Sequence, residues 1–277
     1  MNDHSAPAAT SLELAQLRQD LIDEQQSLDE VVASLSHEQW RRATASPGWS
    51  VADQIGHLTY FDAAAARAIS QPDHFRRDVA DLLAASATTT VDEYTLRNLR
   101  ALPDHRLLDT WRHHRDELAD AARSLHDAAR VAWYGPSMGA KSFLSARLME
   151  VWAHGTDVVD ALDARRAPSD RLRHVVQLGF NTRQWSYAVR GEAAPSGDVA
   201  LELSTPTGEL WRWGGPDASD VVRGSAEEFC LVVTQRRHLD DTSLVVNDLG
   251  RHWLVRAQAF AGTASNGPQP RSNGATH

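Results

Sequence analysis

Apolar residues recur with the period of an α-helix over most of the first 165 positions. The first such segment has one apolar face, formed by Leu14, Leu17, Leu21, Leu28, Val32 and Leu35. The residues 46–50 interrupt the pattern, and Ser50 with Asp53 three positions later is typical of a capping box. We therefore expect a second helix that begins near Val51 and ends before Pro72.

The same periodicity predicts three more helices in this part of the chain, over 91–102, 104–130 and 141–162. The last of them carries an apolar face that includes Leu144, Leu148, Val151 and Val158. Four main helices in about 160 residues are typical of a helical bundle. We predict a four-helix bundle over 1–165.

The pattern changes after Asp163, where a Pro-containing stretch, 164–170, reads as a linker. A helix is expected over 171–190, and Val199, Leu201 and Leu203 then alternate with polar residues up to a turn at 206–208. The return strand at 210–213 completes a predicted hairpin, a third strand ends near 222, and helices are expected over 225–236 and 249–260. The fold class is therefore α+β, with a small α+β domain over 170–262 and a disordered tail over 263–277.

Composition narrows the classes of function. The 277 residues are 42% hydrophobic and 23% charged, which is typical of a core-forming protein. A net charge of −9 argues against nucleic acid as a partner. Neither a signal sequence nor an apolar stretch long enough to span a membrane is recognisable, so we expect a cytoplasmic protein. The single cysteine, Cys230, cannot form an internal disulfide and reads as a small buried hydrophobe.

A row of polar residues on the predicted helix 141–162 is the main candidate for chemistry. Glu150 and His154 are four residues apart and share one face, which Arg147 and Asp157 extend by a turn in each direction. The neighbouring face is apolar, so we expect this row to point into the bundle. A buried carboxylate needs a cation, supplied either by a side chain or by a metal ion.

His57 lies in the middle of the predicted helix that begins near Val51. Together with Glu150 and His154 it would give three ligands from two facing helices, and zinc with three protein ligands keeps one position for water or substrate. From spacing alone, a hydrogen-bonded core pair of Glu150 and His154 and a merely packed His57 stay open. His113 and Glu117 share the same spacing, but their charge-rich surroundings indicate a solvated face.

Two sequence segments resemble a known family. PGWSVADQIGHL (47–58) and the pattern Arg147-x-x-Glu150-x-x-x-His154-x-x-Asp157 resemble the DinB-like superfamily, specifically its actinobacterial mycothiol-dependent maleylpyruvate isomerase group. The resemblance covers nearly the whole chain and is strongest to a less characterised branch of metal-binding proteins. It implies a DinB-like four-helix bundle followed by a small α+β domain. It also implies that His57, Glu150 and His154 bind a divalent metal, usually zinc.

The resemblance further implies a thiol chemistry. Family members use mycothiol as cofactor or co-substrate, and a metal lowers the pKa of a thiol so that the thiolate attacks a small electrophile, in isomerisation or S-transfer. An arginine of the second domain is expected to bind the substrate carboxylate. Arg236 and Arg237 are the first candidates, and Arg183 or Arg190 the next. Asp157 would hydrogen-bond a ligand or an incoming amine.

Two other functions stay open on the sequence. One is a thiol-independent, metal-dependent hydrolase or cyclase in which the metal activates water. The other is a non-enzymatic metalloprotein that binds a small ligand. In each case we expect a small-molecule partner, no nucleic acid, no membrane, and a monomer or homodimer.

Overall fold

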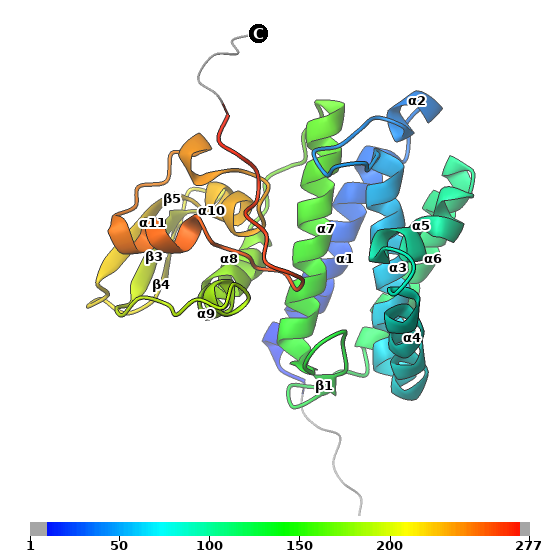
Figure 1. The fold of residues 1–277 in the computed structure, drawn as a ribbon, viewed down its shortest axis with the longest axis horizontal. Coiled ribbons are helices and arrows are strands. Elements are labelled where there is room, and N and C mark those ends of the chain that lie inside the picture. The colour runs from blue at the N-terminus through cyan, green and yellow to red at the C-terminus, as the bar shows by residue number, and fades with distance from the viewer. Residues whose placement is uncertain (1–9, 272–277) are drawn as a thin grey trace, which may run out of the picture. The chain divides into compact units, whose positions relative to one another are not determined.

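The computed structural model describes residues 10–271, and the chain divides into two compact units, Met1–Arg166 and Ala167–His277 (Figure 1). The first unit is helical apart from two short strands, and the second combines helices with a three-stranded sheet. The predicted α+β class is confirmed. The domain limits 1–165 and 170–262 stay predictions.

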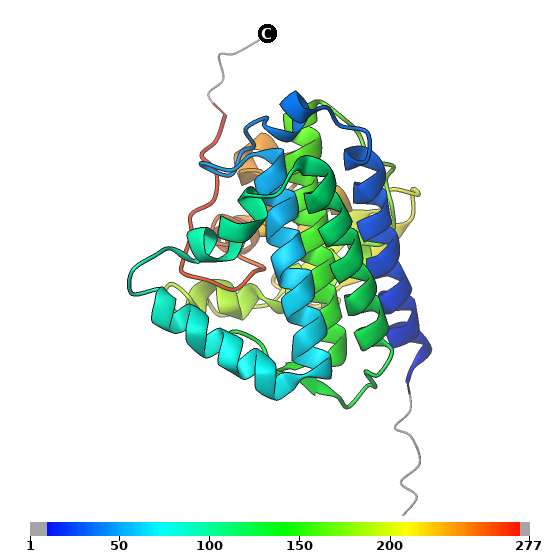
Figure 2. The same ribbon diagram turned by 90° about the vertical axis from the view of Figure 1, so that its right-hand side faces the viewer.

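Four long helices build the first unit and lie side by side in Figure 2: α1 (Leu12–Val32), α3 (Val51–Ser70), α6 (Asp104–Ala122) and α7 (Ala140–Leu162). Helix α3 packs on α6 and α7, and α1 packs on the same two helices, so the four close a ring. The predicted apolar faces meet inside it, where Leu14, Leu28, Ile55, Leu58, Trp111, Leu118, Leu144 and Val151 are fully buried.

Hydrogen bonds at the helix starts explain where the chain becomes helical. Ser50 accepts from the backbone N–H of Asp53 at 3.3 Å, and the Asp53 carboxylate accepts from the backbone N–H of Ser50 at 2.8 Å. This confirms the predicted capping box at the start of α3. The short helix α2 (His37–Trp40) begins with a second capping box, between Ser36 and Gln39.

The helix α4 (Pro72–Ala85) was not predicted, and it packs on α3 beside α5 (Val91–Arg100). We expected the chain to stop being helical at Pro72, but Pro72 is the first residue of the new helix, where its missing N–H costs nothing. Only Phe75 and Leu82 of α4 are buried, which leaves little periodicity to detect.

Other helix ends in this unit also differ from the sequence pattern. The apolar periodicity continues to Leu35, but α1 ends at Val32. Helix α5 ends at Arg100 instead of 102, and α6 ends at Ala122 instead of Arg130. The chain beyond α6 forms the small antiparallel pair β1 (Arg130–Val131) and β2 (Met138–Gly139). Backbone pairing of these strands competes with continued helix there.

One buried carboxylate links all four bundle helices. Asp62 of α3 is fully buried, and its Oδ1 accepts from Arg147 of α7 at 2.8 Å. Its Oδ2 accepts from Gln25 of α1 at 2.9 Å and from the indole N–H of Trp111 of α6 at 3.2 Å. We call these four residues the Asp62 junction. They satisfy a charge that would otherwise be costly to bury.

The second unit has the sheet order β4–β3–β5, built from β3 (Val199–Ser204), β4 (Leu210–Trp213) and β5 (Asp220–Ser225). The predicted hairpin is confirmed as the antiparallel pair β3–β4, and the third strand runs parallel to β3. Helix α10 packs on α8 and on β5, and α11 packs on β5.

The helices of this unit are shorter than predicted: α8 (Leu172–Asn181), α9 (Arg183–Ala188), α10 (Ala226–Val233) and α11 (Asp248–Leu254), with one 3-10 turn, Leu239–Asp241. The single helix expected over 171–190 is interrupted at Thr182, whose hydroxyl donates to the carbonyl of Leu178 at 2.9 Å.

The expected disordered tail is described only as far as Arg271, and residues 272–277 lie outside the described part. Between 263 and 271 there is no helix or strand, but Ser265 accepts from Gln235 at 2.9 Å and donates its backbone N–H to Gln258 at 3.1 Å. Within the described residues, no helix combines the length and the apolar character that crossing a membrane requires.

Candidate metal centre

His57, Glu150 and His154 lie together between helices α3 and α7. Glu150 Oε2 is 3.4 Å from His57 Nε2 and 3.1 Å from His154 Nε2, and the two imidazole rings are 4.3 Å apart between centroids. One potential ligand atom from each residue lies within 4.8 Å of the other two. The sequence placed two of these residues on one helix, and the fold adds the third from the facing helix.

The spacing of these three atoms fits a zinc ion. Zinc–nitrogen and zinc–oxygen bonds of about 2.0–2.1 Å in a tetrahedron place neighbouring ligand atoms about 3.3 Å apart. The two measured separations, 3.4 and 3.1 Å, bracket that value. Two imidazole nitrogens and one carboxylate oxygen are also donors that zinc prefers, so the residues fit a divalent metal of this kind.

The Glu150 side chain is the acceptor at the centre of the group. Burial opposes its ionisation, but hydrogen bonds and charge interactions with His154 and His57 outweigh burial and hold the pKa of Glu150 well below its usual value. The carboxylate is therefore ionised near neutral pH.

The loop before α3 forms one wall of the group. The backbone N–H of Trp49 donates to the carbonyl of Ser46 at 3.0 Å, with Pro47 and Gly48 between them. Gly48 has φ +78°, so this is a type II turn that needs glycine at its third position. The turn places the Trp49 ring 5.9 Å from that of His154, in a stacked arrangement, and 5.2 Å from that of His57.

Gln54 fixes the proton on His154. The hydroxyl of Thr44 donates to a backbone carbonyl at 3.1 Å, so it can only accept from Gln54, whose Nε2 lies 2.8 Å away. The Gln54 amide nitrogen therefore faces Thr44, and its oxygen faces Nδ1 of His154 at 2.5 Å. An amide oxygen only accepts, so Nδ1 carries the proton and Nε2 is the nitrogen available to a metal.

The other polar residues of the predicted row diverge. Asp157 is buried, with its Oδ2 4.0 Å from His154 Nδ1 and 3.4 Å from the donating hydroxyl of Ser46. Asp157 therefore lies beside His57, Glu150 and His154, which we call the metal-ligand group, on the same side as Gln54. Arg147 points instead to Asp62, where it belongs to the Asp62 junction.

The predicted substrate-binding arginines belong to the second unit. Arg236 and Arg237 follow α10, and both donate their backbone N–H to the carbonyl of Leu231; one side-chain nitrogen of Arg236 also donates to the carbonyl of Thr234 at 2.7 Å. Arg183 donates to the carbonyl of Gly197, and Arg190 to that of Ser265. Their roles toward a substrate stay predictions.

A second group has similar chemical donors. His113, His114 and Glu117 of α6 also bring ligand atoms within 4.8 Å, but His113 and Glu117 are exposed. His114 Nδ1 lies 2.8 Å from Glu117. All three residues come from one helix, which agrees with the solvated face expected from the sequence. The two groups differ in burial and in the number of helices that contribute.

The sequence reasoning missed Gln54 and Asp62. Both are polar residues within the apolar face of α3, and both are fully buried. A polar residue in such a position was the available signal, because a buried polar group needs a partner.

Fold and site together define a helical bundle with a three-residue candidate for a divalent-metal site between two of its helices, joined to a small α+β unit. Residues 21–159 match the family model of the mycothiol maleylpyruvate isomerase N-terminal domain. The chain belongs to this family, and the resemblance inferred from the sequence is confirmed.

Relatives and solved structures extend this comparison. Two uncharacterized proteins of Mycobacterium tuberculosis, from strains CDC 1551 / Oshkosh and ATCC 25618 / H37Rv, are each 41% identical over 254 residues, covering 90% of this chain and 96% of theirs. Crystal structures of the mycothiol-dependent maleylpyruvate isomerase and of a histidine-to-alanine mutant match with a TM-score of 0.55 and 16% identity, over 80% of this chain and 89% of theirs. At this identity the structures establish a shared fold.

Proposed function

We propose that the protein is a metal-dependent enzyme of the mycothiol-dependent isomerase or S-transferase type, which activates a small-molecule thiol for attack on a small electrophilic substrate. Zinc is the proposed metal, and His57, Glu150 and His154 are its proposed ligands. The observation that carries the proposal is the close approach of these three donors between α3 and α7, with Glu150 Oε2 at zinc-compatible distances from both histidine nitrogens. Membership of the mycothiol maleylpyruvate isomerase family supports the choice of reaction class.

A bound zinc ion would supply Lewis acidity that lowers the pKa of a coordinating thiol. The chain itself offers no thiolate among its own residues, because its only cysteine, Cys230, is buried and burial raises the pKa of its thiol well above the usual value. The thiol is therefore expected to come from a small molecule, with mycothiol as the proposed one.

The side chains around the proposed ligands orient His154 and flank His57. Gln54 holds the Nδ1 proton of His154, and Trp49 and Phe61 flank His57, with ring centroids 5.2 and 4.5 Å away. Asp157 is proposed to hydrogen-bond an incoming group beside His154. Arg236 and Arg237 are proposed to bind a substrate carboxylate, for which a guanidinium provides paired donors.

The first test is zinc binding by the full chain. Isothermal titration after removal of metal should give one tight site per chain, and the double variant His57→Ala/His154→Ala should lose at least about 100-fold in affinity, since two of three ligands are gone. The matched control is His113→Ala/His114→Ala, which removes two histidines from the exposed group on α6 and should change the affinity less than about threefold. Equal zinc binding by both double variants would refute the ligand assignment.

The second test concerns the thiol. In cobalt-substituted protein, mycothiol should introduce a sulfur-to-cobalt charge-transfer band that an alcohol analogue does not produce. Turnover of a small electrophile should then depend on the thiol. Turnover of an ester or amide without any thiol would instead support the hydrolase or cyclase alternative, which the same three-ligand arrangement can serve.

A further inference from the structure

A separate cavity of ≈ 230 Å³ lies in the first unit, on the side of α3 that faces α5. Gly56 marks this side: a Cβ atom there would lie 3.0 Å from Leu96 of α5. The neighbouring residue His57 faces Glu150 of α7. The cavity and the candidate metal centre therefore lie on different sides of the same helix.

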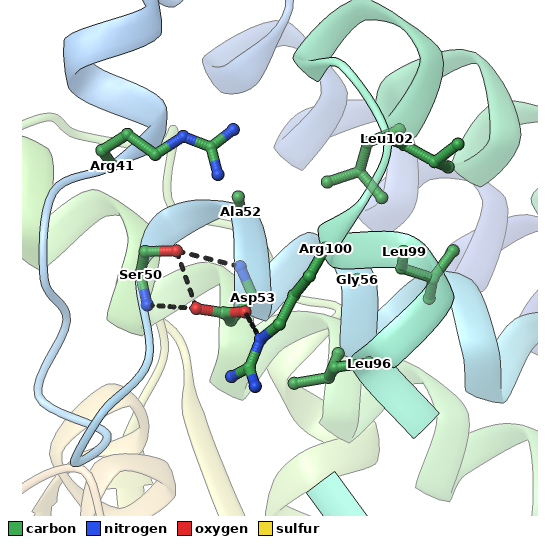
Figure 3. A pocket seen from close by; sticks show the side chains of 10 residues that line it. Arg41, Ser50, Ala52, Asp53, Gly56, Leu96, Leu99, Arg100 and Leu102 are labelled. Carbon is green, nitrogen blue, oxygen red and sulfur yellow. Dashed lines mark hydrogen bonds and ion pairs between the residues drawn. The ribbon is translucent and has the colours of Figure 1, made fainter. Parts of the chain in front are cut away.

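One wall of the cavity is apolar. It is formed by Gly56, Leu96, Leu99, Leu102 and Leu107, and Figure 3 shows three of these leucines along one side of the space. A volume of this size suits a small organic molecule rather than a nucleotide.

Two arginines from different segments border the same cavity, Arg41 after α2 and Arg100 at the end of α5 (Figure 3). Each is held through one nitrogen: Nε of Arg100 donates to Asp53 at 2.7 Å, and a terminal nitrogen of Arg41 donates to Asp104. Both side chains are close to half exposed, 43% and 44%. Within the described residues, the terminal nitrogens of Arg100 have no hydrogen-bond partner.

The acidic residues at the cavity are already engaged. Asp53 accepts from the backbone N–H and the hydroxyl of Ser50, both at 2.8 Å, and from Arg100. Asp104 accepts from Arg41 and interacts with His37 Nδ1 at 2.6 Å. The polar groups with capacity to spare are therefore guanidinium N–H donors, whose natural partner is a carboxylate.

We propose that this cavity is a second small-molecule site, which binds a compact amphipathic carboxylate: the acid group at Arg41, and an aromatic or branched apolar body against Leu96, Leu99 and Leu102. In Figure 3 the Asp53 carboxylate lies between the guanidinium groups of Arg41 and Arg100, so Arg100 compensates the charge of Asp53 and Arg41 is the donor to the ligand. Anchoring of Arg41 by Asp104 reduces the entropy lost when it binds an anion. The site lies within the first unit and needs no residue of the metal centre.

Benzoate is the probe, and the uncharged benzamide and inorganic phosphate are its matched comparisons. The measurement is a ¹H–¹⁵N chemical-shift titration of the full-length His57→Ala/His154→Ala variant without metal, so that carboxylate binding to zinc does not contribute. We expect benzoate to bind with a dissociation constant on the order of millimolar. Benzamide and phosphate should each bind at least about tenfold more weakly, because one lacks the charge and the other the apolar body.

The shifts should map to Asp53, Gly56 and residues 96–102. Leu99→Trp should fill the cavity and weaken benzoate binding at least about tenfold, and Arg41→Gln should weaken it about three- to tenfold. The control Leu83→Trp adds the same side chain at an exposed leucine of α4 and should leave binding unchanged.

Three results would overturn the proposal: no shifts with 20 mM benzoate (about tenfold above the expected constant), equal binding of benzamide, or shifts confined to Trp49 and its neighbours at the mutated metal centre. The chemical-shift map needs no cavity variant, so it decides the matter even if Leu99→Trp fails to fold. Failure of this site would leave the proposed metal-dependent function untouched, since the two use different residues.

Discussion

The bundle contains two carboxylates, one fully buried and one partly exposed, whose charges the fold treats in opposite ways. Asp62 is fully enclosed and accepts from three donors on three other helices, one of which is the positive charge of Arg147. Glu150 is partly exposed and interacts with two imidazole nitrogens, both of which are able to bind a metal. Donors of the protein itself satisfy the charge of Asp62. Beside Glu150, by contrast, His57 and His154 are groups that can bind a cation together with the carboxylate.

The difference teaches how to separate a structural polar cluster from a functional one. Both contain a carboxylate, both involve α3 and α7, and both are surrounded by apolar residues. What distinguishes them is whether the donors already present satisfy the charge. We therefore expect substitutions at the Asp62 junction to change stability, and substitutions around Glu150 to change metal affinity.

The largest expected effect is on stability. Asp62→Ala leaves the buried guanidinium of Arg147 without its partner and should lower the free energy of unfolding by about 3–5 kcal/mol, measured by urea denaturation. Zinc affinity of the folded variant should change less than about threefold. The double variant Asp62→Ala/Arg147→Met should recover part of the loss. If it is no more stable than Asp62→Ala, the charge pair is not the cause.

Removing the metal comes next. Zinc held at about 1,000 times its dissociation constant should raise the free energy of unfolding by about 4 kcal/mol, and a chelator should abolish the gain. The comparison is His57→Ala/His154→Ala, whose denaturation curve should be the same with and without zinc. A zinc-dependent gain in that variant would place the metal elsewhere.

Gln54 is expected to act on affinity. Gln54→Leu removes the acceptor that holds the Nδ1 proton of His154, and we expect zinc affinity to fall about 10–100-fold by titration. Gln54→Glu keeps an acceptor in place and should retain more of the affinity than Gln54→Leu. The reverse order of the two variants would contradict an orienting role.

The smallest effect concerns Asp29 of α1, a third carboxylate with properties between the other two. Burial opposes its ionisation, but Arg112 and Arg115 outweigh burial, so the pKa of Asp29 is lowered in the folded state. The interaction of Asp29 with these two arginines therefore stabilises the folded state above the pKa that Asp29 has in the unfolded chain. This contribution is lost as the pH falls through the lower pKa of Asp29 in the folded state. The free energy of unfolding of the wild type should exceed that of Asp29→Asn by about 1 kcal/mol at pH 6, and this difference should shrink by pH 2.5. A constant difference would exclude titration of Asp29 as its source.

Periodicity predicted most of the bundle, because α1, α3, α6 and α7 each bury a continuous apolar face. It failed where burial is sparse, as in α4 with only Phe75 and Leu82 inside. It also failed at Thr182, where one predicted helix is divided into α8 and α9. A single sequence shows which residues are apolar, but not which backbone hydrogen bonds form where a helix or strand ends.

For the candidate site, spacing alone placed Glu150 and His154 on one face of one helix. The sequence also offered His57 as a third ligand from a facing helix, and the family resemblance favoured this set over the alternatives. Spacing alone left it open, because helix–helix register is a long-range property. Gln54 was not predicted, since its role depends on hydroxyl groups of the loop at Thr44 and Ser46. The geometry supplied what spacing left open: which nitrogen of His154 faces the metal-ligand group.

The Asp62 junction also sets an order for the bundle during synthesis on the ribosome. Gln25, Asp62 and Trp111 emerge first, whereas Arg147 lies 85 residues after Asp62, on the last helix of the bundle. Until that helix has emerged, the interior holds an uncompensated negative charge, and the other three helices gain little by closing around it. The same helix brings Glu150 and His154. Completion of the core and assembly of the metal-ligand group therefore both wait for α7, so that a chain truncated before α7 would have neither.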